Sequence, residues 1–179
     1  MFLNIITPCS RPQNLHTIAE SINIPKENFR WIVVYDGVEL PDKTLIPDIC
    51  EAYCYQDPQS CVGHQQRNFA MDMISDGHIY FNDDDTILHN ELWDSIKDLD
   101  NDFITFNQNT KEGGARLHNR PVQVGHIDSH NFIFKKEISE GIRFVNLYEG
   151  DGIFANQVHN RSKSYIHLNK VLSIYNYLR

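Results

Sequence analysis

Positive charge is scarce in this sequence. Lysines and arginines number 16 against 24 aspartates and glutamates, for a formal net charge of −8 at pH 7. Proteins that bind nucleic acid neutralise phosphates with clustered basic residues, and no basic stripe runs along this chain. We therefore expect no nucleic-acid partner.

Long hydrophobic runs are missing as well. No window of the chain approaches the roughly 20 apolar residues that a transmembrane helix needs. Residues 1–5 lack the basic flank and the small-residue cleavage site of a signal peptide, and they are typical of a first β-strand. We expect no membrane span and a cytoplasmic location.

Cysteines are few, and their spacing fits no metal knuckle. They are Cys9, Cys50, Cys54 and Cys61, with no Cys-x-x-Cys pair among them. Because no secretory context supports pairing, reduced thiols are the default. Internal repeats, low-complexity tracts and linkers are absent too. We therefore expect a single domain over residues 1–179, long enough to bury a real core.

The first half of the chain alternates between strand-like and helix-like segments. Continuous apolar runs at 3–7, 31–35 and 78–81 predict buried strands, and apolar residues at helical spacing predict helices after Pro12 and from Val62. This alternation is typical of an α/β fold with a central, mostly parallel sheet flanked by helices.

The second half is richer in strand-like segments, which favours mixed pairing in the sheet. Residues 111–120 are expected to form a polar, mobile loop. The remaining strands are expected at 53–56, 103–106, 122–124, 131–134, 165–168 and 171–175. The remaining helices are expected at 49–53, at 88–99 and from Ile153.

Three consecutive carboxylates, Asp83, Asp84 and Asp85, follow the apolar run 78–81 after a single residue, Asn82. Like charges at the edge of a buried core raise one another's pKa values unless a cation lies among them. Oxygen ligands favour Mn²⁺ or Mg²⁺, which often share their coordination with substrate phosphates. A plain alternative stays open, in which these residues form a turn or cap a helix.

Two more polar residues end predicted parallel strands, namely Thr7 and Asp36. Ligands of open α/β sheets bind outside the carboxyl ends of the strands. Together with the acidic triplet 83–85, these residues predict a nucleotide site, although Asp36-Gly37 is also a common turn sequence.

Four blocks of the sequence resemble the nucleotide-binding half of GT-A glycosyltransferases. The blocks are Ile6-Thr7-Pro8 with Arg11-Pro12, Trp31–Asp36, Arg67-Asn68 and Tyr80–Asp85. The likeness is greatest to the inverting β-1,3-glucuronyltransferases, with the family 2 transferases next. It covers residues 1–86 well, as a nucleotide-binding half, and 87–179 more loosely, as a donor-sugar and acceptor half. The chain is much shorter than most GT-A enzymes.

The resemblance implies a binding pocket for the nucleotide. Thr7, Pro8 and Arg11 would line the base, and Asp36 would accept a hydrogen bond from the uracil imide. Arg67 would close on the base or the phosphates, although an exposed helix residue is an equal alternative.

Metal binding is implied as well. Asp83 would contact the ribose, Asp85 would bind Mn²⁺ or Mg²⁺ directly, and Asp84 would lie beside them in the nucleotide site. His167 resembles the late histidine that reaches the metal or the diphosphate, but a histidine on an apolar strand is more often a core residue. We assign no role to His126, His130 and His159.

Inverting transfer needs a general base. Asp151 resembles the family's base, and Glu149 is its rival because the pattern also aligns there with a small shift. Either carboxylate is also favourable simply as a charge at a helix N-terminus. Asp128 resembles a residue that touches the donor sugar.

The expected function is transfer of a hexose from a UDP-sugar to a saccharide or other hydroxyl acceptor. Two alternatives stay open. A sugar-phosphate nucleotidyltransferase would use the same carboxylates, but it usually has a glycine-rich phosphate loop, and Pro8–Pro12 contains no glycine. A non-catalytic module that binds nucleotide sugars is the other.

Overall fold

The computed structural model describes residues 1–56 and 63–179. Its strands are β1 (Leu3–Cys9), β2 (Phe29–Tyr35), β3 (Glu51–Cys54), β4 (His78–Phe81), β5 (Phe103–Thr110), β6 (Ala115–Leu117), β7 (Phe132–Lys135) and β8 (Tyr165–Tyr175). Its α-helices are α1 (Leu15–Ser21), α2 (His64–Asp72), α3 (Leu92–Ile96) and α4 (Gly150–His159). Cys61 and the expected helix start at Val62 lie outside the described residues.

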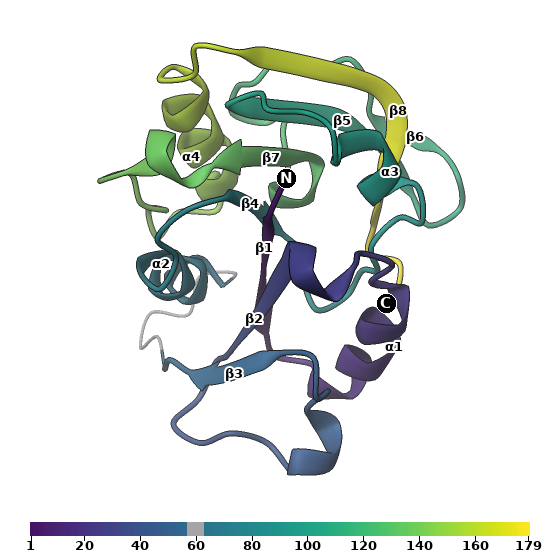
Figure 1. The fold of residues 1–179 in the computed structure, drawn as a ribbon, viewed down its shortest axis with the longest axis vertical. Coiled ribbons are helices and arrows are strands. Elements are labelled where there is room, and N and C mark those ends of the chain that lie inside the picture. Colours follow the sequence, from purple (N-terminus) through teal and green to yellow (C-terminus); the bar gives the residue numbers. More distant parts are fainter. Residues whose placement is uncertain (57–62) are drawn as a thin grey trace.

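The described strands form one eight-stranded sheet in the order β3-β2-β1-β4-β7-β5-β6, with β8 also paired to β5 (Figure 1). Strands β1 to β4 are parallel to one another. Strand β7 runs antiparallel to both β4 and β5, β6 is antiparallel to β5, and β8 is parallel to β5. The sheet is therefore mixed and mostly parallel, which confirms the expected fold class.

The strand directions bring distant parts of the chain to one edge of the sheet. Strands β1, β2, β4 and β8 end at this edge, whereas β6 and β7 run the other way and begin there. Residues that precede β7 or follow β8 therefore meet the residues that follow β1, β2 and β4. Ligands bind at this edge in open α/β sheets.

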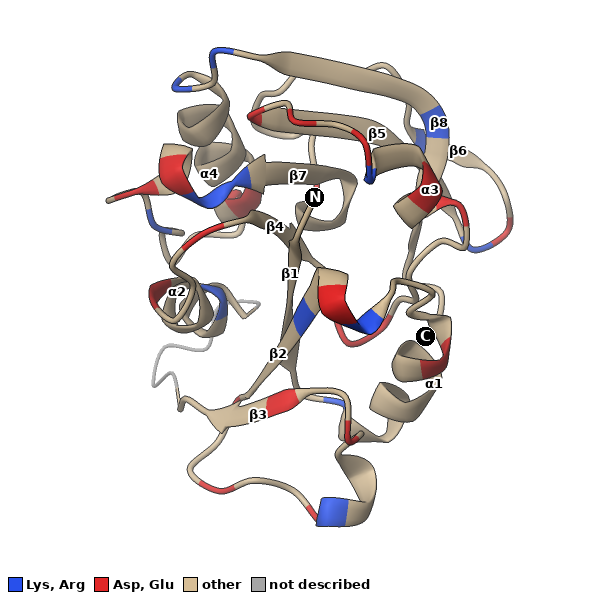
Figure 2. Ribbon diagram, viewed as in Figure 1, with Lys and Arg blue, Asp and Glu red and all other residues tan. Residues whose placement is uncertain are grey.

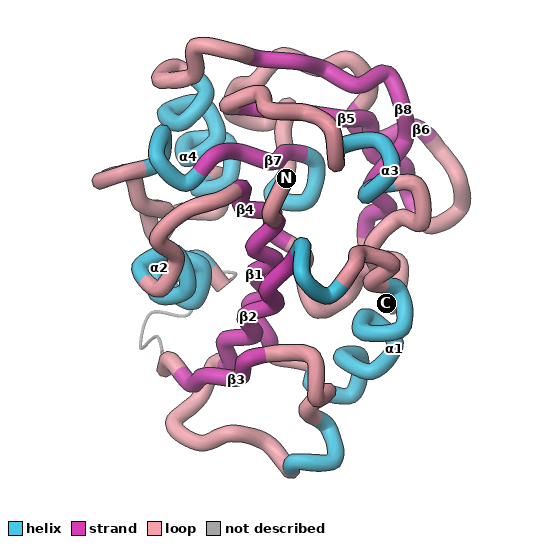
Figure 3. Tube along the Cα trace, in the orientation of Figure 1, coloured by secondary structure: helices cyan, strands magenta, loops and turns pink. Residues whose placement is uncertain are grey.

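Helices cover both faces of the sheet. Helices α1 and α3 lie on one side and α2 and α4 on the other (Figures 1 and 3). All seven residues of β1 are buried, and its side chains alternate between the two hydrophobic clusters. A continuous apolar run is the sequence signature of such a doubly covered strand. No helix among the described residues is long and apolar enough to cross a membrane.

An aromatic cluster lies beneath α2 and α4 and supports the end of β4. The rings of Phe144 and Phe154 stack with centroids 4.1 Å apart, and Phe81 meets both of them edge-on. Burying each such side chain contributes about 1.5–3 kcal/mol. Figure 2 shows β1 and β4 free of charged residues, with the acidic and basic positions in the surrounding segments. The acidic triplet 83–85 therefore follows a strand that is rigidly packed among apolar side chains.

Two expected elements are wrong. Residues 122–124 form a turn, and the strand of this region is β6, inside the segment expected to be a mobile loop. Val122 does not join the sheet, but its side chain is buried in the hydrophobic cluster that contains Phe154 of α4. Residues 49–53 form no helix, and β3 occupies Glu51–Cys54 instead. Short apolar runs carry too little periodicity to separate strand, helix and packed turn.

Two other elements differ in extent. The strands expected at 165–168 and 171–175 are one strand, β8, whose pairing with β5 shifts register near Phe106 and Asn107. This irregularity lets the exposed residues between the two apolar runs stay in the strand. The helix expected at 88–99 is confined to α3, since residues 88–89 are irregular and turns precede and follow the helix at 90–91 and 97–98.

Candidate active site

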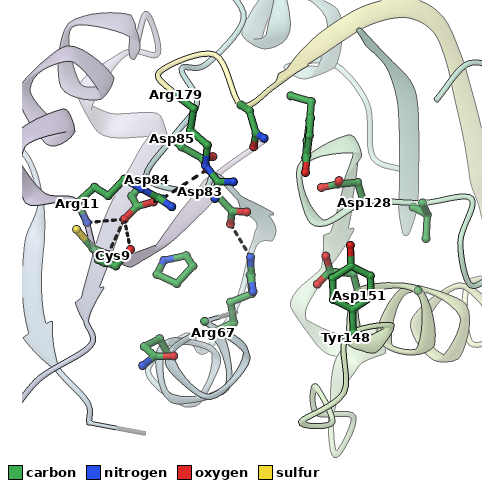
Figure 4. Close-up of a pocket in the computed structure, with 18 of the residues that line it drawn as sticks. Cys9, Arg11, Arg67, Asp83, Asp84, Asp85, Asp128, Tyr148, Asp151 and Arg179 are labelled. Atoms are coloured by element: carbon green, nitrogen blue, oxygen red, sulfur yellow. Dashed lines mark hydrogen bonds and ion pairs between the residues drawn. The ribbon is translucent and has the colours of Figure 1, made fainter. Parts of the chain in front are cut away.

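A cavity of about 490 Å³ opens at the edge where β1, β2 and β4 end. Its other walls come from the first turns of α2 and α4 and from the segments before β7 and after β8 (Figure 4). Its size lies within the range of ligand pockets, about 300–1,000 Å³. Ten residues that the sequence predicts for the site line it, namely Pro8, Arg11, Asp36, Arg67, Asp83, Asp84, Asp85, Asp128, Glu149 and Asp151.

Asp84 holds the loop that follows β1. Its Oδ2 accepts hydrogen bonds from the backbone N–H groups of Ser10 and Arg11, each at 2.6 Å, and its Oδ1 accepts one from the Arg11 guanidinium. The side-chain amide of Asn14 donates to the Asp84 carbonyl at 2.8 Å. Both carboxylate oxygens are therefore engaged within the protein, and the nucleotide contact expected for Asp84 stays a prediction.

Asp83 joins two buried cations. Its Oδ1 accepts a hydrogen bond from Arg67 Nη2 at 2.5 Å, and its Oδ2 accepts one from His130 Nε2 at 2.7 Å. Burial alone would raise the pKa of Asp83, but Arg67 and His130 hold it well below its usual range. Burial lowers the pKa of His130, and Asp83 outweighs this and raises it to about 9. Without a bound metal ion all three groups are charged at neutral pH, and a metal ion bound to His130 would replace a proton on its ring.

Asp85 is the least satisfied member of the acidic triplet. Its Oδ2 pairs with Arg179 Nε at 2.7 Å, while its buried Oδ1 has no hydrogen-bond partner among the described residues. Burial, and next the charge of Asp83, raise the pKa of this carboxyl. A buried carboxylate oxygen without a partner is destabilising, and a cation would relieve it.

Asp83, Asp85 and His130 are placed to share a metal ion. Each offers one ligand atom, and these atoms lie within 4.8 Å of one another. Two carboxylates and one imidazole form a donor set that suits a divalent transition metal such as Mn²⁺. Because Asp85 also has a buried carboxylate oxygen without a hydrogen-bond partner among the described residues, the residues present fit a divalent cation.

Asp151 lies across the cavity, in the first turn of α4 (Figure 4). Its side chain is 28% exposed, and His64 Nε2 lies 3.2 Å from its Oδ1. Burial would raise the pKa of Asp151, but the hydrogen bond from His64 and the charge of Arg67 lower it. Glu149 is exposed, and its side chain has no hydrogen-bond partner in the described ranges. The geometry favours Asp151 over its rival, and the role of either as a base stays a prediction.

Asp128 organises the turn that carries His130. It caps the 3-10 turn Ser129–Asn131, and its Oδ1 accepts a hydrogen bond from the His130 backbone N–H at 3.3 Å. Its Oδ2 pairs with Arg116 Nη1 at 2.7 Å, and the Arg116 guanidinium lies 3.8 Å from the centre of the Tyr175 ring. The sugar contact expected for Asp128 stays a prediction.

Two expected site residues lie elsewhere. Thr7 is fully buried, and its Oγ1 accepts a hydrogen bond from the Trp31 indole at 2.9 Å, so it does not line the cavity. His167 is the third residue of β8, a strand whose opposite end reaches the cavity. Its Nδ1 hydrogen-bonds with Thr105 Oγ1 at 2.9 Å. Both assignments are corrected: Thr7 is a core residue and His167 is a half-buried strand residue, and neither lines the cavity, whereas His130 contacts Asp83.

Sequence reasoning missed His130, His64 and Arg179. A signal for His130 exists, because the polar run Asp128–His130 directly precedes a buried strand. It becomes decisive only when that strand is known to be antiparallel. His64 and Arg179 carry no pattern of their own, since each depends on a partner more than 80 residues away.

Comparisons with known proteins show the fold. No family model and no curated protein matches this chain. The structure of S. aureus TarS 1–349 has a TM-score of 0.78 and 15% sequence identity, covering 97% of this chain and 60% of that one. TarS 1–349 in complex with UDP-GlcNAc has a TM-score of 0.75 and 16% identity, covering 96% and 57%.

A third solved structure is similar as well. The mannosyltransferase PcManGT from Pyrobaculum calidifontis, in complex with GDP-Man and Mn²⁺, has a TM-score of 0.69 and 12% identity, covering 97% of this chain and 56% of that one. The chain thus spans about 60% of the length of these structures or less. They are GT-A structures, so the fold of this chain is GT-A, as the resemblance implied. At such low identities these comparisons show only the fold. They show no relationship to the β-1,3-glucuronyltransferases in particular.

Proposed function

We propose that this chain is a metal-dependent glycosyltransferase that moves a hexose from a UDP-sugar to an acceptor hydroxyl with inversion. One observation carries the proposal: a cluster of Asp83, Asp85 and His130 with an unpartnered carboxylate oxygen shares its cavity with Asp151. Support comes from the solved structures, since TarS binds UDP-GlcNAc and PcManGT binds GDP-Man and Mn²⁺.

The nucleotide would lie along the ends of β1 and β2. Pro8 lines the cavity there, and Asp36 follows β2 directly, where its carboxylate would accept a hydrogen bond from a base imide. Arg11 lies between this wall and the acidic triplet. Arg67 is engaged with Asp83, so we assign it the task of holding that carboxylate rather than the base.

Asp83, Asp85 and His130 would hold the metal ion, so we assign Asp83 to the metal rather than to the ribose contact that the resemblance implied. A divalent ion supplies neutralising charge to the diphosphate as its bond to the sugar breaks. Arg179 pairs with Asp85 at the same place and would add positive charge beside the phosphates. Asp128 faces the other side of the cavity, where the sugar would lie.

Asp151 would be the general base. The acceptor oxygen attacks the anomeric carbon, the bond from that carbon to the phosphate oxygen breaks, and its electron pair leaves with the diphosphate. The acceptor proton passes to the Asp151 carboxylate. Because its pKa is lowered, Asp151 is ionised at neutral pH and ready to accept the proton.

Calorimetric titration with UDP, with and without Mn²⁺, tests the nucleotide and the metal together. We expect binding that strengthens with Mn²⁺, and weaker binding of GDP as the matched nucleotide. Absence of UDP binding under both conditions would overturn the proposal. A panel of UDP-sugars scored by UDP release then identifies the donor.

Replacing the base separates binding from chemistry. Asp151→Asn is expected to keep UDP binding and to lower transfer by about 10²–10⁴-fold, the usual contribution of a general base. Glu149→Gln is the matched control and is expected to retain transfer. Unchanged transfer in Asp151→Asn would remove Asp151 from this role. Release of pyrophosphate from UTP and a sugar phosphate, without UDP release from UDP-sugars, would indicate a nucleotidyltransferase instead.

A further inference from the structure

His64 is a fully buried histidine that contacts the carboxylate of Asp151. It is the first residue of α2 and has no exposed surface. Its Nε2 lies 3.2 Å from Asp151 Oδ1, whereas its buried Nδ1 has no hydrogen-bond partner among the described residues. The ring thus has one polar contact, and that contact is with the carboxylate proposed as the base.

This arrangement selects one tautomer of the ring. An ionised carboxylate only accepts hydrogen bonds, so Nε2 must carry the hydrogen and donate to Asp151. A second hydrogen on Nδ1 would be a buried donor without an acceptor, which costs more than a bare ring nitrogen. His64 therefore donates to Asp151 from Nε2.

The surroundings hold the ring in place. It stacks on Phe144 with centroids 5.1 Å apart and an interplanar angle of 20°. On its other side lies Gly150, where an added Cβ would lie 2.4 Å from His64 Cε1. Helix α2 begins after Gly63, which has a φ of +77°. A glycine next to Asp151 is thus what allows the histidine and the carboxylate to approach each other.

Helix α2 connects the two sides of the cavity. His64 and Arg67 are three residues apart and lie on one helix face. His64 contacts Asp151, while Arg67 contacts Asp83 in the acidic cluster. The first turn of α2 therefore fixes the position of the base relative to the proposed metal ligands.

We propose that His64 positions the general base: its Nε2–H holds Asp151 Oδ1, so that Asp151 Oδ2 is left for the acceptor hydroxyl. This inference rests on the proposed function, since it gives Asp151 a base role. His64 itself touches no reacting atom. The charged and titratable groups that act on Asp151 are His64, Arg67 and Asp83.

Kinetics of two substitutions test this role. His64→Phe keeps a ring to stack on Phe144 and removes the hydrogen bond, whereas His64→Gln keeps a side-chain donor. We expect His64→Phe to lower kcat by about a hundredfold, as for a misplaced reacting group, with the donor KM within about threefold. His64→Gln is expected to recover part of the loss. His16→Gln, at an exposed histidine, is the control.

The pH profile separates positioning from a merely structural effect. The hydrogen bond from His64 favours the ionised form of Asp151, so its removal raises the pKa of Asp151. The acidic limb of kcat should therefore move to higher pH in His64→Phe and return towards the wild-type position in His64→Gln. Wild-type kcat in His64→Phe, or a loss without movement of this limb, would overturn the inference.

A spectroscopic measurement on the wild-type protein requires no activity. The ¹⁵N signals of the histidine rings, assigned to His64 by comparison with His64→Gln, should show hydrogen on Nε2 alone. They should change in Asp151→Asn. A ring without hydrogen on Nε2 would overturn the inference even if His64→Phe fails to fold. If the wild-type protein transfers no sugar, the proposed function fails, while the tautomer still decides whether His64 donates to Asp151.

Discussion

Replacing Asp83 by asparagine should destabilise the protein, because it removes the carboxylate that compensates Arg67. Arg67 is 2% exposed, and its Nη2 lies 2.5 Å from Asp83 Oδ1. Asparagine keeps the volume and one oxygen acceptor, but it loses the charge and the second oxygen, which accepts the hydrogen bond from His130. Removing one partner of a buried pair costs about 3–5 kcal/mol.

Two features of the structure place the expected cost at the lower end of that range. The Asp83 side chain is 26% exposed, so water screens part of the interaction. Loss of Asp83 also relieves repulsion of Asp85, although Arg179 already compensates Asp85 in part. We therefore expect Asp83→Asn to lower the free energy of unfolding by about 3 kcal/mol.

Urea unfolding in the presence of a chelator measures this quantity without a contribution from bound metal. The matched variants are Arg67→Met and the double variant Arg67→Met with Asp83→Asn. Because the double variant removes both members of the Arg67–Asp83 pair, its loss should be at least about 1 kcal/mol smaller than the sum of the single losses. Strictly additive losses, or a loss below about 1 kcal/mol in Asp83→Asn, would refute the reasoning.

Three further predictions concern the metal, a glycine and a histidine. Mn²⁺ at about a hundredfold excess over its dissociation constant should stabilise the wild-type protein by about 2.7 kcal/mol. Thermal unfolding should show that Asp85→Asn loses this stabilisation and that Asp36→Asn keeps it. An equal stabilisation of both variants would exclude Asp85 as a ligand. Gly150→Ala places a Cβ 2.4 Å from His64 Cε1 and 2.7 Å from Val145 O, whereas the nearest atom at Gly37 is 3.8 Å away. Urea unfolding should show a loss of about 1–3 kcal/mol for Gly150→Ala and within about 0.5 kcal/mol for Gly37→Ala, and similar midpoints would contradict the close packing. Burial lowers the pKa of His78, so the unfolded chain takes up a proton that the folded protein resists, and stability should fall as the pH drops below about 6.5. His78→Gln should make this fall shallower between about pH 7 and pH 5, and an unchanged slope would show that His78 is not its source.

The side of the cavity at the ends of β1, β2 and β4 was predictable because its signals are local. Each parallel strand covered on both faces is a continuous apolar run, and the polar residue that follows it marks the cavity edge. Asp36 after β2 and Asp83 after β4 were found in this way. The prediction for Thr7 was wrong because its side chain is buried in the core and accepts a hydrogen bond from Trp31. A residue's position along a strand does not determine whether its side chain faces the cavity or bonds to a neighbour in the core.

The opposite side of the cavity depended on strand direction. His130 reaches Asp83 because β7 is antiparallel to β4, and His167 stays away because β8 is parallel to β5. Periodicity carries no information on direction, since a strand has the same pattern either way. The assignment of the late histidine was therefore beyond the sequence.

From the sequence alone, this chain is an α/β protein with three carboxylates at the end of a buried strand, and only the family resemblance gives those carboxylates different roles. The tertiary structure made them unequal. Asp84 holds the loop after β1, Asp83 lies between Arg67 and His130, and Asp85 keeps one oxygen without a partner in the described chain. The physical reason is that local apolar pattern sets where a strand ends, whereas the partners of a charge come from distant segments that only the packed sheet brings together.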